Sequence, residues 1–276
     1  MFENENVIYK NIDGVEILQF KKLLEYDNVI THAYCLGTNR NFRTGRVNGG
    51  KITPQEYNKA LDDYKSLCKS VDLDYTDLVK TIQTHTDNVS NIEKKKIEGP
   101  DFNTYKDVDG LCTNKEDIIL STTNADCILL LFFDPVKKVI ANVHSGWKGT
   151  LQRISIKTIR NMKEKYGCNE KNILVCMCPS IRKCHFEVGE DVYNLFYKEF
   201  KDIIQKENIF ENKDGKWHID TIEINRDILL KEGLLPENII DSGICSVCNK
   251  EYMHSYRAEG DAYGLNTAII SLKEEK

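Results

Sequence analysis

Apolar positions in the first third of the chain come in short runs separated by polar and glycine-rich stretches. The runs at 7–10, 15–20 and 28–37 predict strands, whereas TNRNFRTGRVNGG at 38–50 predicts a loop. A helical spacing follows, because Thr53 is suited to cap a helix whose apolar residues recur three or four positions apart. These residues are Tyr57, Leu61, Tyr64 and Leu67.

The centre of the chain carries the strongest strand pattern. ADCILLLFFDP at 125–135 is apolar without alternation, which indicates a strand covered on both faces. The run Val139–Val143 is predicted to pair with it across a turn at Asp134–Lys138. From Gly149 onward the apolar residues lie on one helical stripe, and Gly167 is suited to end that helix.

The remaining segments continue the mixture of strands and helices. Further strands are predicted at 78–83, 110–113, 117–122, 172–178, 238–241 and 265–272, and helices at 189–207 and 220–232. Only five prolines interrupt the chain, and no low-complexity linker separates its parts. The pattern predicts one α/β domain over residues 1–276, with a mixed β-sheet flanked by helices.

Composition narrows the function classes. Hydrophobic residues make up 41% and charged residues 29% of the chain, which is typical of a soluble protein. The net charge is −5 and the basic residues are scattered, so no nucleic-acid partner is expected. The longest basic run, Lys94–Lys96, is interpreted as a solvated surface loop. The longest apolar run, Cys127–Phe133, is too short to span a membrane.

The cysteines indicate a reducing compartment. The N-terminus MFENENVIYK is polar and acidic, unlike a secretory signal, and the ten cysteines are expected to remain thiols in the cytoplasm. They should be divided between core-filling residues and metal or catalytic groups. One option is a structural zinc held by Cys245 and Cys248 together with Cys176 and Cys178, although CxxC occurs only once.

Three residues with suitable chemistry stand at predicted strand ends. His85 follows one strand, Cys127 begins the apolar run, and His144 ends the next strand. Imidazole nitrogen and thiolate sulfur suit zinc, with copper as the alternative metal, and three protein ligands leave the open position of a catalytic zinc. The three residues are far apart in sequence and form no compact motif, so each also fits a structural role.

The segment after His144 offers a second feature. Ser145, Gly146 and Thr150 surround a predicted helix start, whose backbone N–H groups and dipole favour an anion. Lys148 adds a positive charge. The alternative is a tight strand-to-helix turn that carries an exposed lysine.

Five segments occur together in one order: QTHTDNV, DGLCTNKEDIILSTTNADCILLLFFDP, NVHSGWKGT, CPSIRKCHFEVGEDV and ICSVCNKEYMHSYRAEGDAYG. This set resembles the YfiH family, also called the laccase-domain or polyphenol-oxidase family, whose members include purine nucleoside phosphorylases. The resemblance implies an α/β domain, similar in fold to a bacterial toxin deamidase, in which His85, Cys127 and His144 bind one zinc. It also implies phosphorolysis of adenosine, inosine and methylthioadenosine, with adenosine deamination as a further activity.

With this resemblance, the expected partners are a purine nucleoside and phosphate. Ser145, Gly146 and Lys148 are expected to contact phosphate, and Arg257 is a further candidate anion contact. Asp126 is a candidate proton shuttle, with an aspartate hydrogen-bonded to backbone as the alternative interpretation. The chain is expected to be a monomer or a weak homo-oligomer.

Several family motifs are altered in this chain. TNRNFRTGRVNGG stands where the family has GGVS and Asn-Leu-Gly segments, Cys178–Pro179 where it has Gly-Pro, and Gly264–Leu265 where it has Gly-Arg. The metal candidates are intact, but contacts to nucleoside and phosphate should differ.

Three other functions fit parts of the sequence. One is a cysteine hydrolase or deamidase, with Cys127 as nucleophile and His144 as base. The others are a copper-dependent polyphenol oxidoreductase and a zinc-binding interaction module. Metal content separates the cysteine hydrolase from the metal-dependent alternatives. Phosphate-dependent turnover separates a phosphorylase from a zinc-binding interaction module.

Overall fold

Strand β9 (Ile128–Asp134) is buried on both faces in the computed structural model, as its unbroken apolarity predicts. Its odd-numbered residues Leu129, Leu131 and Phe133 face one core, and Leu130 and Phe132 face another. Successive side chains of a strand point to opposite faces, so a strand between two cores needs no polar positions. The structure describes residues 2–45, 52–95, 103–204 and 209–274.

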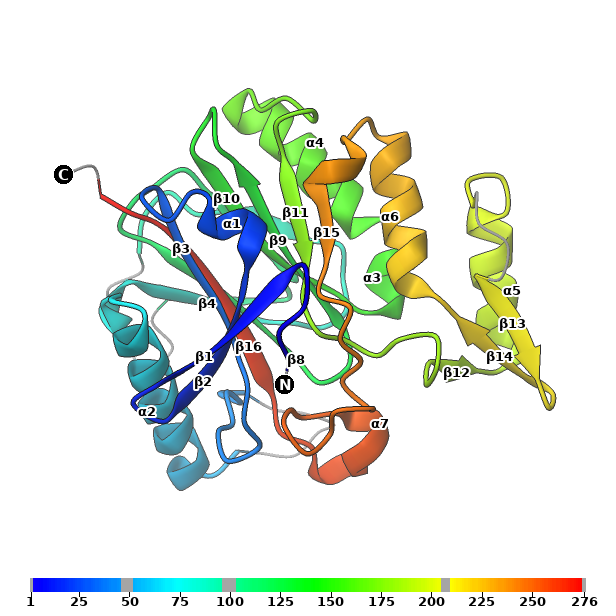
Figure 1. Ribbon diagram of the computed structural model, residues 1–276, viewed down its shortest axis with the longest axis horizontal. Coiled ribbons are helices and arrows are strands. Elements are labelled where there is room, and N and C mark those ends of the chain that lie inside the picture. The colour runs from blue at the N-terminus through cyan, green and yellow to red at the C-terminus, as the bar shows by residue number, and fades with distance from the viewer. Residues whose placement is uncertain (1, 46–51, 96–102, 205–208, 275–276) are drawn as a thin grey trace.

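Two mixed sheets pack face to face, and a small third sheet stands at one end of the molecule (Figure 1). The seven-stranded sheet has the order β1 (Val7–Ile12), β2 (Val15–Phe20), β3 (Ile30–Cys35), β16 (Asn266–Leu272), β8 (Ile119–Asn124), β4 (Leu78–Ile82), β6 (Thr104–Lys106). The six-stranded sheet has the order β15 (Ile239–Asp241), β11 (Leu174–Met177), β9, β10 (Val139–Ser145), β7 (Gly110–Thr113), β5 (Val89–Asn91). The small sheet has the order β12 (Glu187–Val188), β14 (Lys216–Ile219), β13 (Phe210–Lys213).

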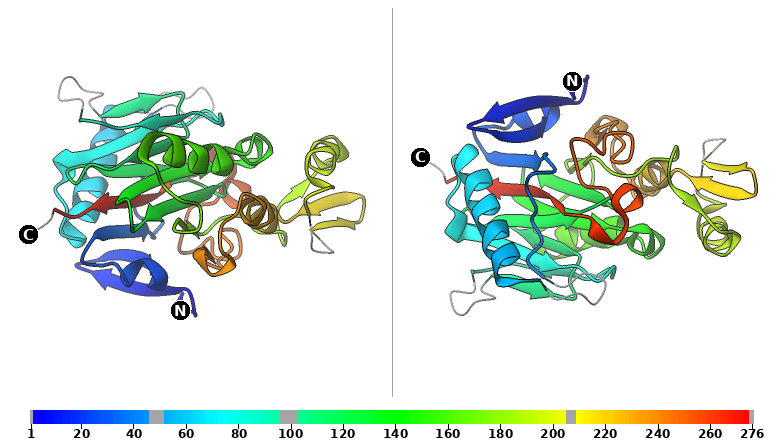
Figure 2. Two further views of the ribbon diagram at one scale, coloured as in Figure 1. Left: turned by 90° about the horizontal axis from the view of Figure 1, so that it is seen from above. Right: turned by 90° about the horizontal axis from the view of Figure 1, so that it is seen from below.

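Helices cover the outer faces of both large sheets (Figure 2). Helix α2 (Pro54–Ser70) packs its Tyr64 and Leu67 on the seven-stranded sheet. Helices α4 (Ile154–Tyr166) and α6 (Thr221–Lys231) cover the six-stranded sheet, and α5 (Glu190–Phe200) lies beside the small sheet. The predicted α/β domain with flanking helices is confirmed, but it contains two large sheets instead of one, because apolar periodicity identifies strands without identifying their partners.

A buried polar side chain joins the two sheets. Asn142 in β10 donates hydrogen bonds to the carbonyls of Leu120 in β8, at 3.0 Å, and Ala268 in β16, at 2.8 Å. Its own oxygen accepts from Thr122. This bridge lies two residues before His144 and fixes β10 against the opposite sheet.

The predicted helix ends are confirmed where side-chain chemistry determines them. Thr53 and Glu56 form a reciprocal capping box at the start of α2, and Gly167 ends α4 with a φ of 69°. Two further helices, α1 (Lys21–Leu24) and α7 (Tyr256–Glu259), are short. None of the described helices is long and apolar enough to cross a membrane.

Some predicted boundaries are wrong. The helix expected from Gly149 is divided into α3 (Trp147–Leu151) and α4, because Arg153 has a left-handed φ of 58°. The helix expected at 189–207 ends at Phe200, and its last three positions lie outside the described residues. The short strands β5, β6, β12, β13 and β14 were not predicted, since they lack an apolar run. In the basic run, Lys95 pairs with Asp77, whereas Lys96 and loop positions 46–50 lie outside the described residues.

Candidate active site

Three chain segments meet where β9 begins and β10 ends. These strands are antiparallel neighbours, and Ser145 pairs with Ile128, which places Cys127 beside the end of β10. His144 is the residue before Ser145, and His85 lies in the loop between β4 and β5. The topology therefore brings together the three predicted ligand residues.

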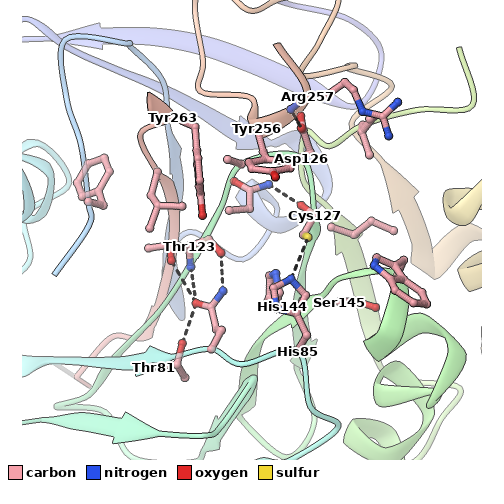
Figure 3. A pocket seen from close by; sticks show the side chains of 18 of the residues that line it. Thr81, His85, Thr123, Asp126, Cys127, His144, Ser145, Tyr256, Arg257 and Tyr263 are labelled. Carbon is pink, nitrogen blue, oxygen red and sulfur yellow. Dashed lines mark hydrogen bonds between the residues drawn. The ribbon is translucent and has the colours of Figure 1, made fainter. Parts of the chain in front are cut away.

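The donor atoms of His85, Cys127 and His144 all lie within 4.8 Å of one another. Cys127 Sγ is 3.8 Å from His85 Nε2, and the two imidazole rings meet edge to face with centroids 5.0 Å apart. Figure 3 shows the three side chains pointing toward one another. His144 is 3% exposed, whereas His85 is exposed, so the set is open on one side. This donor chemistry fits a zinc or copper ion with a free coordination position.

Asp109, which the sequence analysis missed, organises both histidines. Its buried carboxylate accepts a hydrogen bond from His144 Nδ1 at 2.8 Å, which leaves Nε2 as the ligand atom of that ring. It also accepts from the backbone N–H groups of His85 at 3.2 Å and Thr86 at 2.8 Å. A carboxylate behind a ligating histidine fixes the tautomer and orientation of the ring. Asp109 therefore holds His144 by its side chain and His85 by its backbone.

The charges in this group shift the pKa values of its members. Burial favours the neutral thiol of Cys127, but the adjacent His144 outweighs burial and lowers the thiol pKa to about 6. Burial also favours neutral His144, but Cys127 and Asp109 raise its pKa to about 9. The pKa of Asp109 is lowered, because its hydrogen bond to His144 outweighs burial. The site therefore favours a thiolate at neutral pH, the form that binds metals or attacks electrophiles.

A pH-dependent reactivity follows for protein kept metal-free with a chelator. Alkylation of Cys127 by iodoacetamide should become fast as the pH rises through about 6, because the His144 imidazolium stabilises the thiolate. Mass spectrometry gives the rate at each pH, and Cys127→Ala corrects for labelling of the other cysteines. A midpoint at the ordinary thiol value of 9.0 would contradict this charge arrangement.

The backbone of Gly146 lies against the ligand set, that is, the three candidate metal ligands His85, Cys127 and His144. A Cβ at this position would lie 2.6 Å from His85 Cδ2 and 3.2 Å from Cys127 Sγ, so only glycine permits this approach. The Gly146 carbonyl accepts from Thr150 N at 2.8 Å, and the Ser145 and Thr150 hydroxyls are 3.0 Å apart. The turn after β10 thus supports the metal candidates.

A cavity of about 600 Å³ opens beside the three residues, a size typical of small-molecule sites. Two of its described lining residues are arginines, Arg43 and Arg257. The Arg43 guanidinium lies over the Tyr263 ring, 4.7 Å from the centroid. Apolar and aromatic side chains also line the cavity, among them Phe42, Tyr256 and Leu265. Sequence reasoning missed Arg43 and the tyrosines, because only folding brings them to the ligand set.

Lys148 lies apart from the described cavity lining. It is exposed, and its Nζ is 5.4 Å from the centroid of the Trp147 ring. Ser145 does line the cavity, whereas Gly146 contacts the ligand set from behind. The predicted contacts of Ser145, Gly146 and Lys148 with phosphate stay predictions. Because Lys148 does not line the described cavity, it would not directly contact a substrate bound in this cavity.

Asp126 connects the cavity to two loops near the C-terminus. One carboxylate oxygen accepts from Ser246 Oγ at 2.6 Å, and the other accepts from the backbone N–H of Arg257 at 2.7 Å. The Arg257 guanidinium donates to the carbonyls of His185 at 2.7 Å and Glu187 at 3.0 Å. These bonds favour a positioning role for Asp126. Proton transfer by Asp126 and anion binding by Arg257 stay predictions.

The four-cysteine zinc site considered from the sequence is wrong. Cys176 lies in β11 and Cys178 directly follows this strand, and both are buried in the core between the sheets. Among the described residues, Cys245 and Cys248 are accompanied by Cys184 and His185. The alternation of side chains along β11 points Cys176 and Cys178 into the core, and neither belongs to a metal-ligand group among the described residues.

The fold and site define an α/β protein of one family. The family model described as "Multi-copper polyphenol oxidoreductase laccase" matches residues 40–273, so the chain belongs to this family. The crystal structure of the Bacillus licheniformis hypothetical protein YfiH has the same fold, with a TM-score of 0.79 over 93% of this chain and 96% of that chain, at 22% identity. The predicted YfiH membership is confirmed.

Similar curated proteins carry enzyme names. Purine nucleoside phosphorylase YlmD of Bacillus subtilis is 29% identical over 79% of this chain and 80% of its own length. Adenosine deaminase RL5 of an unknown prokaryotic organism is 31% identical over 73% of this chain and 78% of its own length. The chain spans 38% of the length of the Mus musculus and Homo sapiens relatives, both named purine nucleoside phosphorylase LACC1.

Proposed function

We propose that the protein is a zinc-dependent purine nucleoside phosphorylase that acts on adenosine, inosine and methylthioadenosine. The observation that carries the proposal is the set of His85, Cys127 and His144, open toward a cavity of nucleoside size. The name of the Bacillus subtilis relative supports the same reaction class. Copper is the alternative metal, and adenosine deamination is proposed as a side activity in keeping with the name of the second relative.

In phosphorolysis, a phosphate oxygen bonds to the anomeric carbon of the ribose while the bond from that carbon to the purine nitrogen breaks. The bonding electron pair leaves with the base, which must be stabilised and protonated. A zinc ion held by the three ligands would supply Lewis acidity beside the leaving base. Asp109 keeps the His144 ring in place, and the aromatic side chains of Tyr256 and Tyr263 line the cavity that would receive the purine.

The phosphate requires a cation in the cavity. Arg43 is the best-placed candidate, because its guanidinium lies in the cavity lining and its Nε is buried without a hydrogen-bond partner among the described residues. The Arg43 guanidinium donates to one carbonyl, that of Tyr263, whereas the Arg257 guanidinium donates to two. Lys148, outside the described lining, would act through its charge on the approaching anion.

The proposed activity predicts that inosine or adenosine is converted to ribose 1-phosphate and free base only when phosphate is present. Chromatography of a nucleoside panel, with and without phosphate, measures this. Arg43→Ala should raise the KM for phosphate about tenfold or more through loss of a charged contact, whereas Lys148→Ala should change it less.

The other outcomes of the panel are equally specific. Base release that ignores phosphate would indicate a hydrolase, and inosine as the single product from adenosine would indicate a deaminase. No turnover of any nucleoside by zinc-loaded protein would reject the proposal and favour an interaction module.

One observation favours a second candidate, the cysteine hydrolase. Cys127, His144 and Asp109 form a thiol–imidazole–carboxylate series, in which the pKa of the thiol is lowered. Protein purified without added metal separates the two. One zinc ion per chain that the parent protein holds and Cys127→Ala lacks supports the phosphorylase, whereas equal zinc in the two proteins, with rapid alkylation of Cys127 in the parent, supports the hydrolase.

A further inference from the structure

A second group of metal-binding side chains lies outside the described cavity lining. Cys184, His185, Cys245 and Cys248 each place one donor atom within 4.8 Å of the other three. Cys184 and Cys248 are exposed and Cys245 is buried. The sequence showed the CxxC half of this group, but the other half comes from a loop far away in the chain.

The spacing of the donor atoms matches a tetrahedral metal site. Zinc–sulfur bonds of about 2.3 Å place the sulfur atoms of a tetrahedron about 3.8 Å apart. Cys184 Sγ lies 3.6 Å from Cys245 Sγ and 3.8 Å from Cys248 Sγ. His185 Nδ1 lies 3.1, 3.7 and 3.5 Å from the sulfur atoms of Cys184, Cys245 and Cys248. Three thiols and an imidazole nitrogen thus surround one point.

The surrounding backbone is arranged to support a thiolate. The N–H groups of Cys248 and Arg182 both point at Cys245 Sγ. The two loops are also joined by their backbones, because Ser246 N donates to Ser180 O at 3.0 Å and Ser180 N donates to Ile244 O at 3.3 Å. The donor atoms are therefore held together by contacts other than those among the ligands themselves.

We propose that Cys184, His185, Cys245 and Cys248 bind a structural zinc ion, separate from the candidate active-site metal. Four protein ligands close the coordination sphere, as in structural sites, whereas the active-site set supplies three. The site joins the loop after β11 to the loop after β15. This inference does not depend on the proposed phosphorylase activity.

The position of this zinc site explains what it would stabilise. The first loop carries His185, whose carbonyl accepts from Arg257, and the second carries Ser246, which donates to Asp126. Ile181 and Phe186, on either side of the ligand pair, line the cavity. The second zinc thus stabilises one wall of the active-site cavity without contacting a substrate bound there.

The experiment uses the full chain with Cys127→Ala, which removes one ligand of the active-site metal. Protein purified without added metal should contain one zinc ion per chain by elemental analysis. Adding Cys248→Ser or Cys184→Ser should reduce this to a small fraction, while adding Cys168→Ser, a change outside both ligand sets, should not. Cobalt substitution of the Cys127→Ala chain should produce sulfur-to-cobalt charge-transfer absorption, which does not require that the serine variants fold.

Three results would overturn the proposal. One is equal zinc in the Cys127→Ala chain with and without the Cys248 change. Another is a cobalt-loaded Cys127→Ala chain without charge-transfer absorption. The third is a disulfide from Cys184 to Cys245 or Cys248 in freshly isolated protein, found by peptide mapping without reductant.

Discussion

His144→Ala is expected to lose the active-site metal and to lower kcat/KM for phosphorolysis by more than about 100-fold. Changes to residues behind a metal ligand commonly cost 10- to 100-fold, and loss of the ligand itself should cost more. Removal of His144 also leaves the buried Asp109 carboxylate without its hydrogen-bonded imidazole. Elemental analysis and steady-state kinetics on the same preparation measure both effects.

His32→Ala is the matched control for this change. His32 is a buried histidine in β3, outside the described cavity lining and both ligand groups, and its Nε2 accepts a hydrogen bond from the backbone N–H of Phe20 at 2.7 Å. Its replacement should leave zinc content and turnover close to the parent values. A His144→Ala protein that is folded, fully active and unchanged in zinc would remove this residue from the ligand set.

Asp109→Asn is expected to weaken metal binding about 10- to 100-fold, with a parallel loss of activity at limiting zinc. The amide is neutral and has one acceptor oxygen, so it cannot accept at once from His144 and His85 on one side and from the backbone of Thr86 on the other, and the common anchor of the two histidines is weakened. Competition with a chromogenic chelator measures the affinity.

Asp107→Asn provides the control, because Asp107 is an exposed carboxylate in the same loop. It contacts the Thr84 hydroxyl at 3.2 Å and neither histidine ring. An affinity of Asp109→Asn equal to that of Asp107→Asn would show that the buried carboxylate does not act on the metal site.

Local sequence patterns predicted the elements that depend on interactions between residues close in sequence. The capping box at Thr53, the left-handed Gly167 and the two-faced strand β9 each depend on residues close in sequence. The three metal candidates were found because each stands at the end of such a strand. Their convergence was implied by the family resemblance, and the pairing of β9 with β10 accounts for it.

The missed residues depend on contacts between distant segments. In the sequence, Asp109 belongs to a polar segment that predicts only a turn, and the start of β7 places it beside His144. Arg43 lies in a loop that reaches the cavity only in the folded chain. The option of a zinc site that joins Cys245 and Cys248 to Cys176 and Cys178 is wrong for the same reason. A short spacing such as CxxC identifies half of a site, whereas the other half comes from the tertiary structure.

Two residues of the candidate active site, the ligand candidate His85 and Asp126 beside Cys127, adopt backbone conformations that suit glycine. His85 has a φ of 62° and Asp126 a φ of 86°, and such angles cost a residue with a Cβ about 1–2 kcal/mol. Glycine would relieve this cost but would remove an imidazole at one position and a carboxylate at the other. Selection for a more stable chain and selection for this chemistry therefore act in opposite directions at the same two positions. Drift toward glycine at either position would mark a descendant that has kept the fold and lost a side chain of the candidate site.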